Sequence, residues 1–311
     1  MTLLTLNRAP ASRDRHLTAD WVELLALRSP DREYSRHDLI TELQLLNDID
    51  AGAGSSDQRG QSYEALADDT YAHLRYRSDV FGTMYPFSLT ADGELLKRLR
   101  TSAARRIYVA LLLASSGRWL GATEEKAVRN NFEVLTKAAV QVWLSDTFRV
   151  QLFGTTARGS RYSGNFRTKV TALAEDLGMK PHLTFDVPDN DTGDGGLDVV
   201  AWPKATEDSG PDNLRVFVQA ATGLNFLHKQ TDMRHERWTR WVPLLGKATE
   251  VLAVPYCYRS VQGGWYKARD LTTILLDRVR IAHLLVGSPH PAILDNLVDK
   301  VLAVGPPGQR T

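Results

Sequence analysis

The sequence has little of several features that would narrow its function. It has a single cysteine, Cys257, in 311 residues, which excludes an internal disulfide framework and a cysteine-based zinc site. Its longest uninterrupted apolar run extends from Ile107 to Ala114, far short of the roughly 20 residues that a membrane-spanning helix needs. The first residues carry their charges after a very short apolar patch, so we expect no signal peptide. These absences favour a cytoplasmic protein that does not associate with a membrane.

An excess of one charge sign is also missing. Lysine and arginine number 38 and aspartate and glutamate 37, so the formal net charge is +1. A domain that binds nucleic acid often has a strongly basic balance, and here only local clusters could take that role. Each of the two basic clusters could equally be a solvated helix face: Lys97, Arg98, Arg100, Arg105 and Arg106, and then Lys229, Arg234, Arg237 and Arg240.

The hydrophobic pattern changes near residue 120. Residues 1–120 are expected to form an all-helical N-terminal region, with Ser35 and Asp38 at the spacing of a capping box. Residues 121–287 alternate strands and helices, which predicts an α/β domain with a mixed central sheet flanked by helices. A helix in residues 288–304 should pack on this core, and residues 305–311 should form a disordered tail. The expected strands are 148–153, 197–202, 214–220, 250–258 and 273–276, and the expected helices are 124–145, 165–177, 225–245 and 277–285.

Two polar residues lie in otherwise apolar strands of this domain. Asp198 interrupts the run from Leu197 to Ala201, and a carboxylate is costly to bury there unless it is paired or binds a metal. Gln219 lies near the end of the next apolar strand. Neighbouring strands that end in an Asp and a Gln could bring both side chains to one point. Such oxygen ligands suit a hard cation such as Mg²⁺.

These residues carry a resemblance to a known family. The stretch GDGGLDVVAW (193–202), with Gln219 lying 21 residues after Asp198, resembles the PD-(D/E)XK nuclease superfamily, especially its Mrr-like restriction endonucleases. The resemblance covers much of residues 121–286, including Glu133 on an upstream helix and the order helix, strand, strand, strand, helix, strand. It implies a restriction endonuclease-like core in which Glu133, Asp198 and Gln219 hold Mg²⁺ (or Mn²⁺).

The sequence departs from the family at the catalytic lysine. In the superfamily this lysine follows the Glu or Gln by two positions, where the present chain has Ala221. The nearest replacement is Lys229, after an Asn225 that is suited to cap the next helix. From the first turn of that helix, the Lys229 side chain could reach back toward the end of the strand. A lysine in this place would orient the attacking water or stabilise the developing anion.

Each candidate also has a purely structural interpretation. Asp198 could be a satisfied structural aspartate, Gln219 could bond a neighbouring loop, Glu133 could pair with Lys137 at i+4, and Lys229 could be a surface lysine. Asp191 and Asp194 are typical turn formers. His228 and His235 lack the spacing of a zinc helix, and Cys257 is expected in the core.

The resemblance implies a metal-dependent nuclease that hydrolyses phosphodiester bonds, with DNA as the expected substrate, in a bacterial defence or restriction setting. Arg234, Arg237 and Arg240, interleaved with Trp238 and Trp241, would grip backbone phosphates. A partner protein from the same defence system is expected, and a homodimer is a further option. The alternative is a catalytically inactive nuclease-fold subunit that binds nucleic acid or partner proteins. A metal-dependent hydrolase of small molecules ranks last, because no glycine loop for a nucleotide is present.

Overall fold

The computed structural model forms two compact units, which we describe separately. Unit 1 comprises Met1–Lys126, Tyr256–Tyr266 and Ala292–Thr311, and unit 2 comprises Ala127–Pro255 and Lys267–Pro291. Within the described part of the chain, no helix is both long enough and apolar enough to cross a membrane. The structure describes residues 4–7, 9–10, 15–48, 56–154, 161–182, 191, 193–204, 214–287 and 295–303.

Unit 1 contains a small sheet among its helices. Its helices are α1 (Arg15–Arg28), α2 (Arg36–Asp48), α3 (Ser56–Phe81), η1 (Gly82–Met84), α4 (Ala103–Ala114), η2 (Gly117–Trp119) and α9 (Asp295–Leu302). Its strands are β1 (Glu33–Ser35), β2 (Phe87–Leu89) and β3 (Leu95–Arg98), which pair antiparallel in the order β1-β3-β2. The expectation of an all-helical N-terminal region is therefore wrong.

A tight turn builds the β2–β3 hairpin. The Asp92 carboxylate accepts hydrogen bonds from the Thr90 hydroxyl (2.5 Å) and from the Glu94 backbone N–H (3.0 Å). Gly93 takes a positive φ of 77°, a conformation that glycine adopts at little cost. With only three or four residues, the strands carry too short an alternation to be recognised from their hydrophobic pattern.

The last helix, α9, belongs to unit 1. Asp299 on α9 pairs with Arg106 on α4 at 2.7 Å, and the carbonyl of Leu302 accepts a hydrogen bond from Arg98 at 2.8 Å. Val298 and Val301 are buried. The expected packing of this helix on the α/β core is thus replaced by packing in the N-terminal unit. The expected disordered tail, 305–311, lies outside the described residues.

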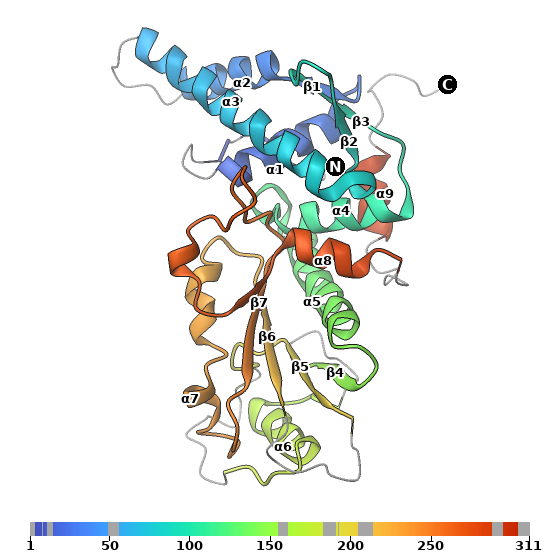
Figure 1. Ribbon diagram of the computed structural model, residues 1–311, viewed down its shortest axis with the longest axis vertical. Helices are drawn as coiled ribbons and strands as arrows, with labels where there is room; N and C mark the ends of the chain where they lie inside the picture. Colours follow the sequence, from blue (N-terminus) through green and yellow to red (C-terminus); the bar gives the residue numbers. More distant parts are fainter. Residues whose placement is uncertain are drawn as a thin grey trace. The chain divides into compact units, whose positions relative to one another are not determined.

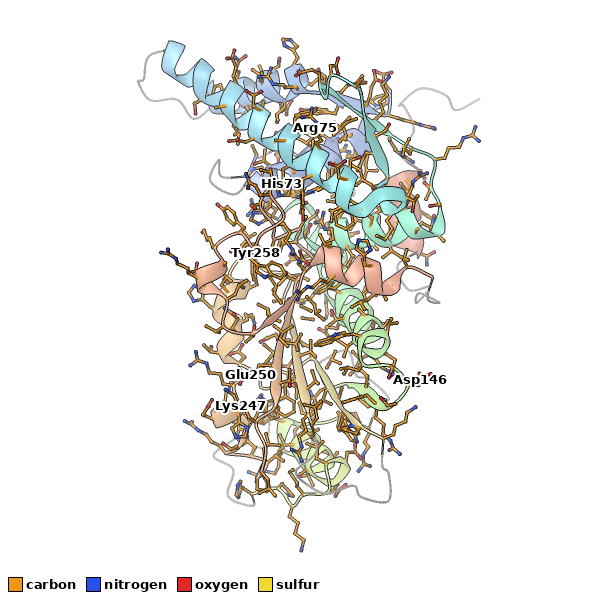
Figure 2. The ribbon with its side chains drawn as sticks, in the orientation of Figure 1. His73, Arg75, Asp146, Lys247, Glu250 and Tyr258 are labelled. Carbon is orange, nitrogen blue, oxygen red and sulfur yellow. The ribbon has the colours of Figure 1, made fainter. Side chains whose placement is uncertain are left out.

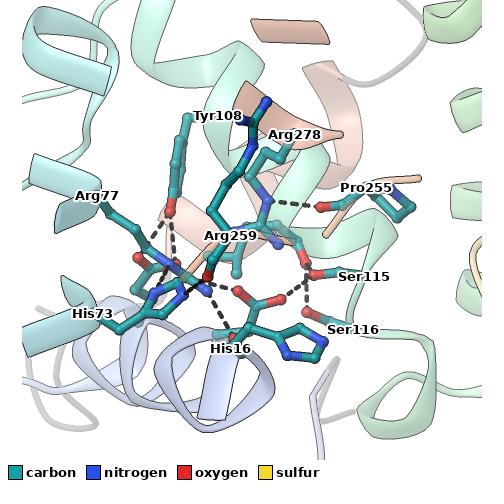
Figure 3. Close-up of polar contacts among 12 residues, drawn as sticks. His16, His73, Arg77, Tyr108, Ser115, Ser116, Pro255, Arg259 and Arg278 are labelled. Atoms are coloured by element: carbon teal, nitrogen blue, oxygen red, sulfur yellow. Dashed lines mark hydrogen bonds and ion pairs between the residues drawn. The ribbon is translucent and has the colours of Figure 1, made fainter. Parts of the chain in front are cut away.

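A buried ionic network lies in the interior of unit 1 (Figure 3). The guanidinium of Arg77, which has no exposed side-chain surface, contacts Asp20 at 2.6 Å and Glu23 at 2.8 Å. Tyr85 and Tyr108 donate hydroxyl hydrogen bonds to Glu23. Burying such charges is costly unless they are paired and hydrogen-bonded, and here the pairs come from α1 and α3.

Unit 2 is an α/β unit with a mixed five-stranded sheet, in the order β4-β5-β6-β7-β8. Strand β5 pairs antiparallel with both β4 and β6, whereas β6, β7 and β8 run parallel to one another. Figure 1 shows β5, β6 and β7 side by side. The strands are β4 (Phe148–Leu152), β5 (Val199–Pro203), β6 (Val216–Ala220), β7 (Thr249–Ala253) and β8 (Ile274–Leu276), and the helices are α5 (Ala122–Leu144, which begins in unit 1), α6 (Phe166–Asp176), η3 (Phe226–Thr231), α7 (His235–Trp238), η4 (Ala268–Asp270) and α8 (Arg278–Leu285).

The mixed sheet with helices is confirmed, but the helix expected over 225–245 is wrong. The chain forms only the short η3 and α7, separated by a turn at Asp232. A Cβ on Gly196 would clash with the Cβ of Asp232, so this turn packs closely on a glycine of a distant loop. Tertiary packing thus overrides the local helical pattern here.

Strand β7 also ends earlier than expected. It stops at Ala253, shortly before Pro255, which has no N–H with which to extend the ladder. Cys257 is fully buried, as expected of a core residue, but it lies beyond the strand.

Candidate active site

The backbone of Asp198 is fixed between two strands of the unit 2 sheet. Its N–H donates to the carbonyl of Val218 at 3.0 Å, and its own carbonyl accepts from the N–H groups of Phe153 (2.8 Å) and Gly154 (3.3 Å). The residue is only 6% exposed, and its side chain accepts a hydrogen bond at Oδ2 from the backbone N–H of Ala220 at 2.7 Å. The carboxylate is therefore anchored at one oxygen.

The second carboxylate comes from α5. Glu133 lies on the buried face of that helix and is only 5% exposed, whereas Lys137 is partly exposed. A Cβ placed on Gly154 would lie 2.8 Å from Oδ1 of Asp198 and 3.1 Å from Oε2 of Glu133. The two oxygens are therefore no more than about 6 Å apart. Both oxygens therefore face one point beside the backbone of residue 154, here called the space above Gly154, which a Cβ could enter only if they shifted.

The charges in this space repel one another. Burial raises the pKa of Asp198 well above its ordinary value, and the negative charges of Glu133 and Asp194 raise it further. The hydrogen bond from Ala220 and the positive charge of Lys229 act in the opposite direction. A cation near Asp198 would therefore stabilise the ionised form of its carboxylate.

Gln219, near the end of β6, connects two neighbouring segments. Its side-chain nitrogen is placed to donate to the carbonyls of Gly196 (3.1 Å) and Lys229 (2.9 Å). The side-chain nitrogen of Gln219 therefore has the structural role considered above, a hydrogen bond to a neighbouring loop. A role in metal binding stays a prediction for the amide oxygen alone.

The two positions that could carry the catalytic lysine, 221 and 229, differ in burial. Ala221 continues the sheet, donating its N–H to the carbonyl of Ala253 at 2.9 Å, and is buried. Lys229 lies on η3 with a partly exposed side chain, and its charge favours the ionised form of Asp198. The expected capping of this helix by the Asn225 side chain is wrong, because that side chain makes no cap hydrogen bond.

Two residues near the carboxylates were missed by sequence reasoning. Gly154 gave no signal, since its role is to lack a side chain beside residues far along the chain. Lys169 on α6 did carry a signal, because it lies on the same helix face as the apolar Phe166 and Leu173. It is only 4% exposed, and its ammonium donates to the carbonyl of Gly193 at 3.0 Å.

The aspartates of the preceding loop act as turn formers, as expected. Asp191 accepts a hydrogen bond from the N–H of Gly193, and Asp194 accepts one from the N–H of Gly196, both at 2.8 Å. A Cβ on Gly195, whose φ is 62°, would lie 2.9 Å from the ring of Phe166. The glycines of GDGG therefore fit a tight turn that leads directly into Asp198.

The predicted phosphate-binding segment is only partly at the surface. Arg234 and Arg240 are exposed, whereas Arg237 pairs with Asp232 at 2.9 Å. Trp238 is fully buried, so it is not available to contact nucleic acid as expected. At the start of α7, the backbone N–H of His235 donates to the carboxylate of Glu250 on β7, which is labelled in Figure 2.

Glu133 and Asp198 fit a hard cation better than a zinc ion. Both offer carboxylate oxygens, the ligand type that Mg²⁺ prefers, and Mg²⁺ commonly uses one or two carboxylates together with water. Across the described residues, no group of three His, Cys, Asp or Glu side chains is arranged to hold a metal. Comparisons with family models, curated proteins and solved structures gave no match.

Proposed function

We propose that unit 2 is a metal-dependent nuclease with a restriction endonuclease-like core, which hydrolyses phosphodiester bonds of DNA in a bacterial defence or restriction setting. The observation that carries this proposal is the pair of buried carboxylates, Glu133 and Asp198, on either side of the space above Gly154. The order of α5, β4 and the β5–β6 pair, with β7 parallel to β6, supports the resemblance.

Each residue of the site would have its own role in such a reaction. Glu133, Asp198 and the amide oxygen of Gln219 would hold Mg²⁺ (or Mn²⁺). A bound ion of this kind lowers the pKa of water and neutralises charge on the scissile phosphate. Lys229, partly exposed, would orient the attacking water or stabilise the developing negative charge.

The surroundings of the carboxylates would position the substrate. The exposed Arg234 and Arg240 would contact backbone phosphates, and Arg237 would do so in competition with its pairing to Asp232. Such contacts fix the register of a nucleic acid without reading its sequence. We expect a cytoplasmic protein with DNA and a protein of the same defence system as partners, and a homodimer remains an option.

A second function is favoured by the residue at the lysine position. Because Ala221 stands where the superfamily has its catalytic lysine, unit 2 could be an inactive nuclease-fold subunit that binds nucleic acid or a partner protein. In that case the carboxylates would keep a structural or cation-binding role without supporting cleavage.

The test uses the close approach of both carboxylates to Gly154. We expect purified protein to cut supercoiled plasmid with Mg²⁺ or Mn²⁺ and to be inactive with EDTA. Gly154→Ala should lower the rate by about 100-fold or more, since losing one part of such a site typically costs about 10²–10³. The methyl group would occupy the space that the two carboxylate oxygens border.

A matched control is Gly264→Ala, where a Cβ would find only an ordinary contact with Ser260 at 3.8 Å. This variant should cut plasmid at the wild-type rate. Metal binding without cleavage by the wild-type protein would favour the inactive subunit. A folded Gly154→Ala variant with full activity would show that the site is elsewhere.

A further inference from the structure

Lys169 is the one lysine that is buried among the described residues. It lies on α6, a helix that begins at Phe166 with the Asn165 side chain as its cap. An ammonium group is costly to remove from water unless negative groups or hydrogen-bond acceptors surround it. The groups around the Lys169 ammonium must therefore offset this cost.

Helix α6 holds the glycine turn that leads into Asp198. The Lys169 ammonium donates to the carbonyl of Gly193 at 3.0 Å, and the backbone N–H of Phe166 donates to the carbonyl of Asp191 at 2.6 Å. At the other end of the turn, the Gln219 nitrogen is placed to donate to the carbonyl of Gly196. The turn is thus held at both ends by polar side chains.

Negative charges also act on this ammonium. Burial lowers the pKa of Lys169, while the negative charges of Asp194, Asp191 and Glu133 act to raise it. Glu133 is the carboxylate that borders the space above Gly154. Lys169 thus interacts electrostatically with Glu133, as Lys229 does with Asp198.

We propose that Lys169 is a positioning residue of this site: its ammonium holds the Gly193 carbonyl and balances the charge of Glu133, and thereby limits how tightly the site binds a divalent cation. This inference rests on the metal site of the proposed function but not on cleavage. Two positive charges close together in a site of low polarity repel strongly, so the buried ammonium would weaken the binding of a metal ion beside Glu133.

The test measures Mn²⁺ binding by titration calorimetry on the full chain. Lys169→Met removes the ammonium and should bind Mn²⁺ about three- to tenfold more tightly than the wild-type protein. Lys169→Arg keeps the charge and should stay within about twofold of wild type. Lys180→Met removes an exposed lysine charge just beyond α6 and should also leave the affinity unchanged.

Melting temperatures separate this role from a merely structural one. Mn²⁺ should raise the melting temperature of Lys169→Met by more than that of the wild-type protein, because tighter binding to the folded state stabilises it more. If Lys169→Met does not fold, Lys169→Gln, which keeps a donor without the charge, should show the same tighter binding.

The outcomes distinguish this inference from the proposed nuclease function. Unchanged or weaker Mn²⁺ binding by Lys169→Met or Lys169→Gln would overturn the role of Lys169. A wild-type protein that binds no Mn²⁺ would overturn both. A wild-type protein that binds Mn²⁺ without cutting DNA would reject the nuclease, and the variant affinities would still decide the role of Lys169.

Discussion

At the scale of single residues, Asp198 shows how the fold can hold a carboxylate at a cost. Backbone hydrogen bonds on both sides fix its main chain, and the Ala220 N–H fixes one of its side-chain oxygens. Burial and two nearby carboxylates nevertheless raise its pKa, so the ionised form destabilises the folded state. Retaining such a residue is typical of sites where function offsets a loss of stability.

Asp198→Asn should therefore abolish Mn²⁺ binding and plasmid cleavage without lowering the melting temperature. The amide has nearly the same shape, can still accept the Ala220 hydrogen bond, and carries no charge to repel Glu133. Calorimetry, cleavage assays and thermal melts on one preparation check this. The exposed Asp146→Asn (Figure 2) serves as the control and should behave as wild type. An Asp198→Asn variant that unfolds would instead support the structural interpretation of this aspartate.

Lys229→Ala should lower the single-turnover cleavage rate by about 10²–10³ with little change in DNA affinity, if Lys229 stabilises the developing charge. A lysine that only contacts a phosphate would instead weaken binding and lower the salt dependence by about one unit of slope. The substitution leaves the bond to Gln219 in place, because that bond uses the Lys229 carbonyl. Rates and affinities measured across salt concentrations separate the two roles.

The rescue variant makes this comparison sharper. Adding Ala221→Lys to Lys229→Ala restores a lysine at the position that the superfamily uses, and should recover part of the lost rate. Wild-type cleavage by Lys229→Ala alone would show that Lys229 has no catalytic role, and would direct attention to other cations of the site.

Single-residue predictions from sequence depend on how local the signal is. The GGLDVV stretch and the spacing to Gln219 predicted residues that the structure places on adjoining segments of one sheet. For Glu133, the sequence leaves a pair with Lys137 at i+4 open, and the burial of Glu133 is seen only in the structure. The position of Gly154 depends on a distant helix, which no spacing encodes.

At the scale of elements, some predicted segments agree closely with the structure and others do not. Helix α5, expected over 124–145, runs from Ala122 to Leu144, and β4, expected over 148–153, runs from Phe148 to Leu152. The hairpin of β2 and β3 was missed because its register depends on the Asp92 turn more than on alternation. The 225–245 segment kept a helical pattern but turns at Asp232 to pack on Gly196.

At the scale of the whole molecule, the chain does not divide at one point. Unit 1 recruits Tyr256–Tyr266 and Ala292–Thr311 in addition to its N-terminal segment. The ion pair between Arg106 and Asp299 joins two segments of this unit that lie 193 residues apart in the sequence. Local composition cannot predict that a late segment of the chain packs in the first unit. That packing depends on contacts between segments that are far apart in the sequence.

The buried network of unit 1 gives a prediction for the pH dependence of stability. Burial lowers the pKa of His73 to about 3, and the adjacent charge of Arg77 acts in the same direction. His73 lies next to Arg77, whose Nε donates to its ring at 3.1 Å, and its other nitrogen is 2.9 Å from the carbonyl of Arg259. The folded protein therefore keeps this ring neutral at pH values where an unfolded histidine takes up a proton.

The free energy of unfolding should consequently fall as the pH decreases from about 6.5 toward 3, and the contribution of His73 should be fully present above that window. Each pH unit below 6 should cost up to about 1.4 kcal/mol from this one group. His73→Gln should be less steep by this amount in denaturant titrations between pH 4 and 7, whereas the exposed His182→Gln should keep the wild-type slope. Because the unfolded chain binds the additional proton, a His73→Gln slope equal to that of wild type would mean that the ring is already protonated in the folded protein. In that case the Arg77 network would have to accommodate a second cation beside its guanidinium, contrary to the packing described here.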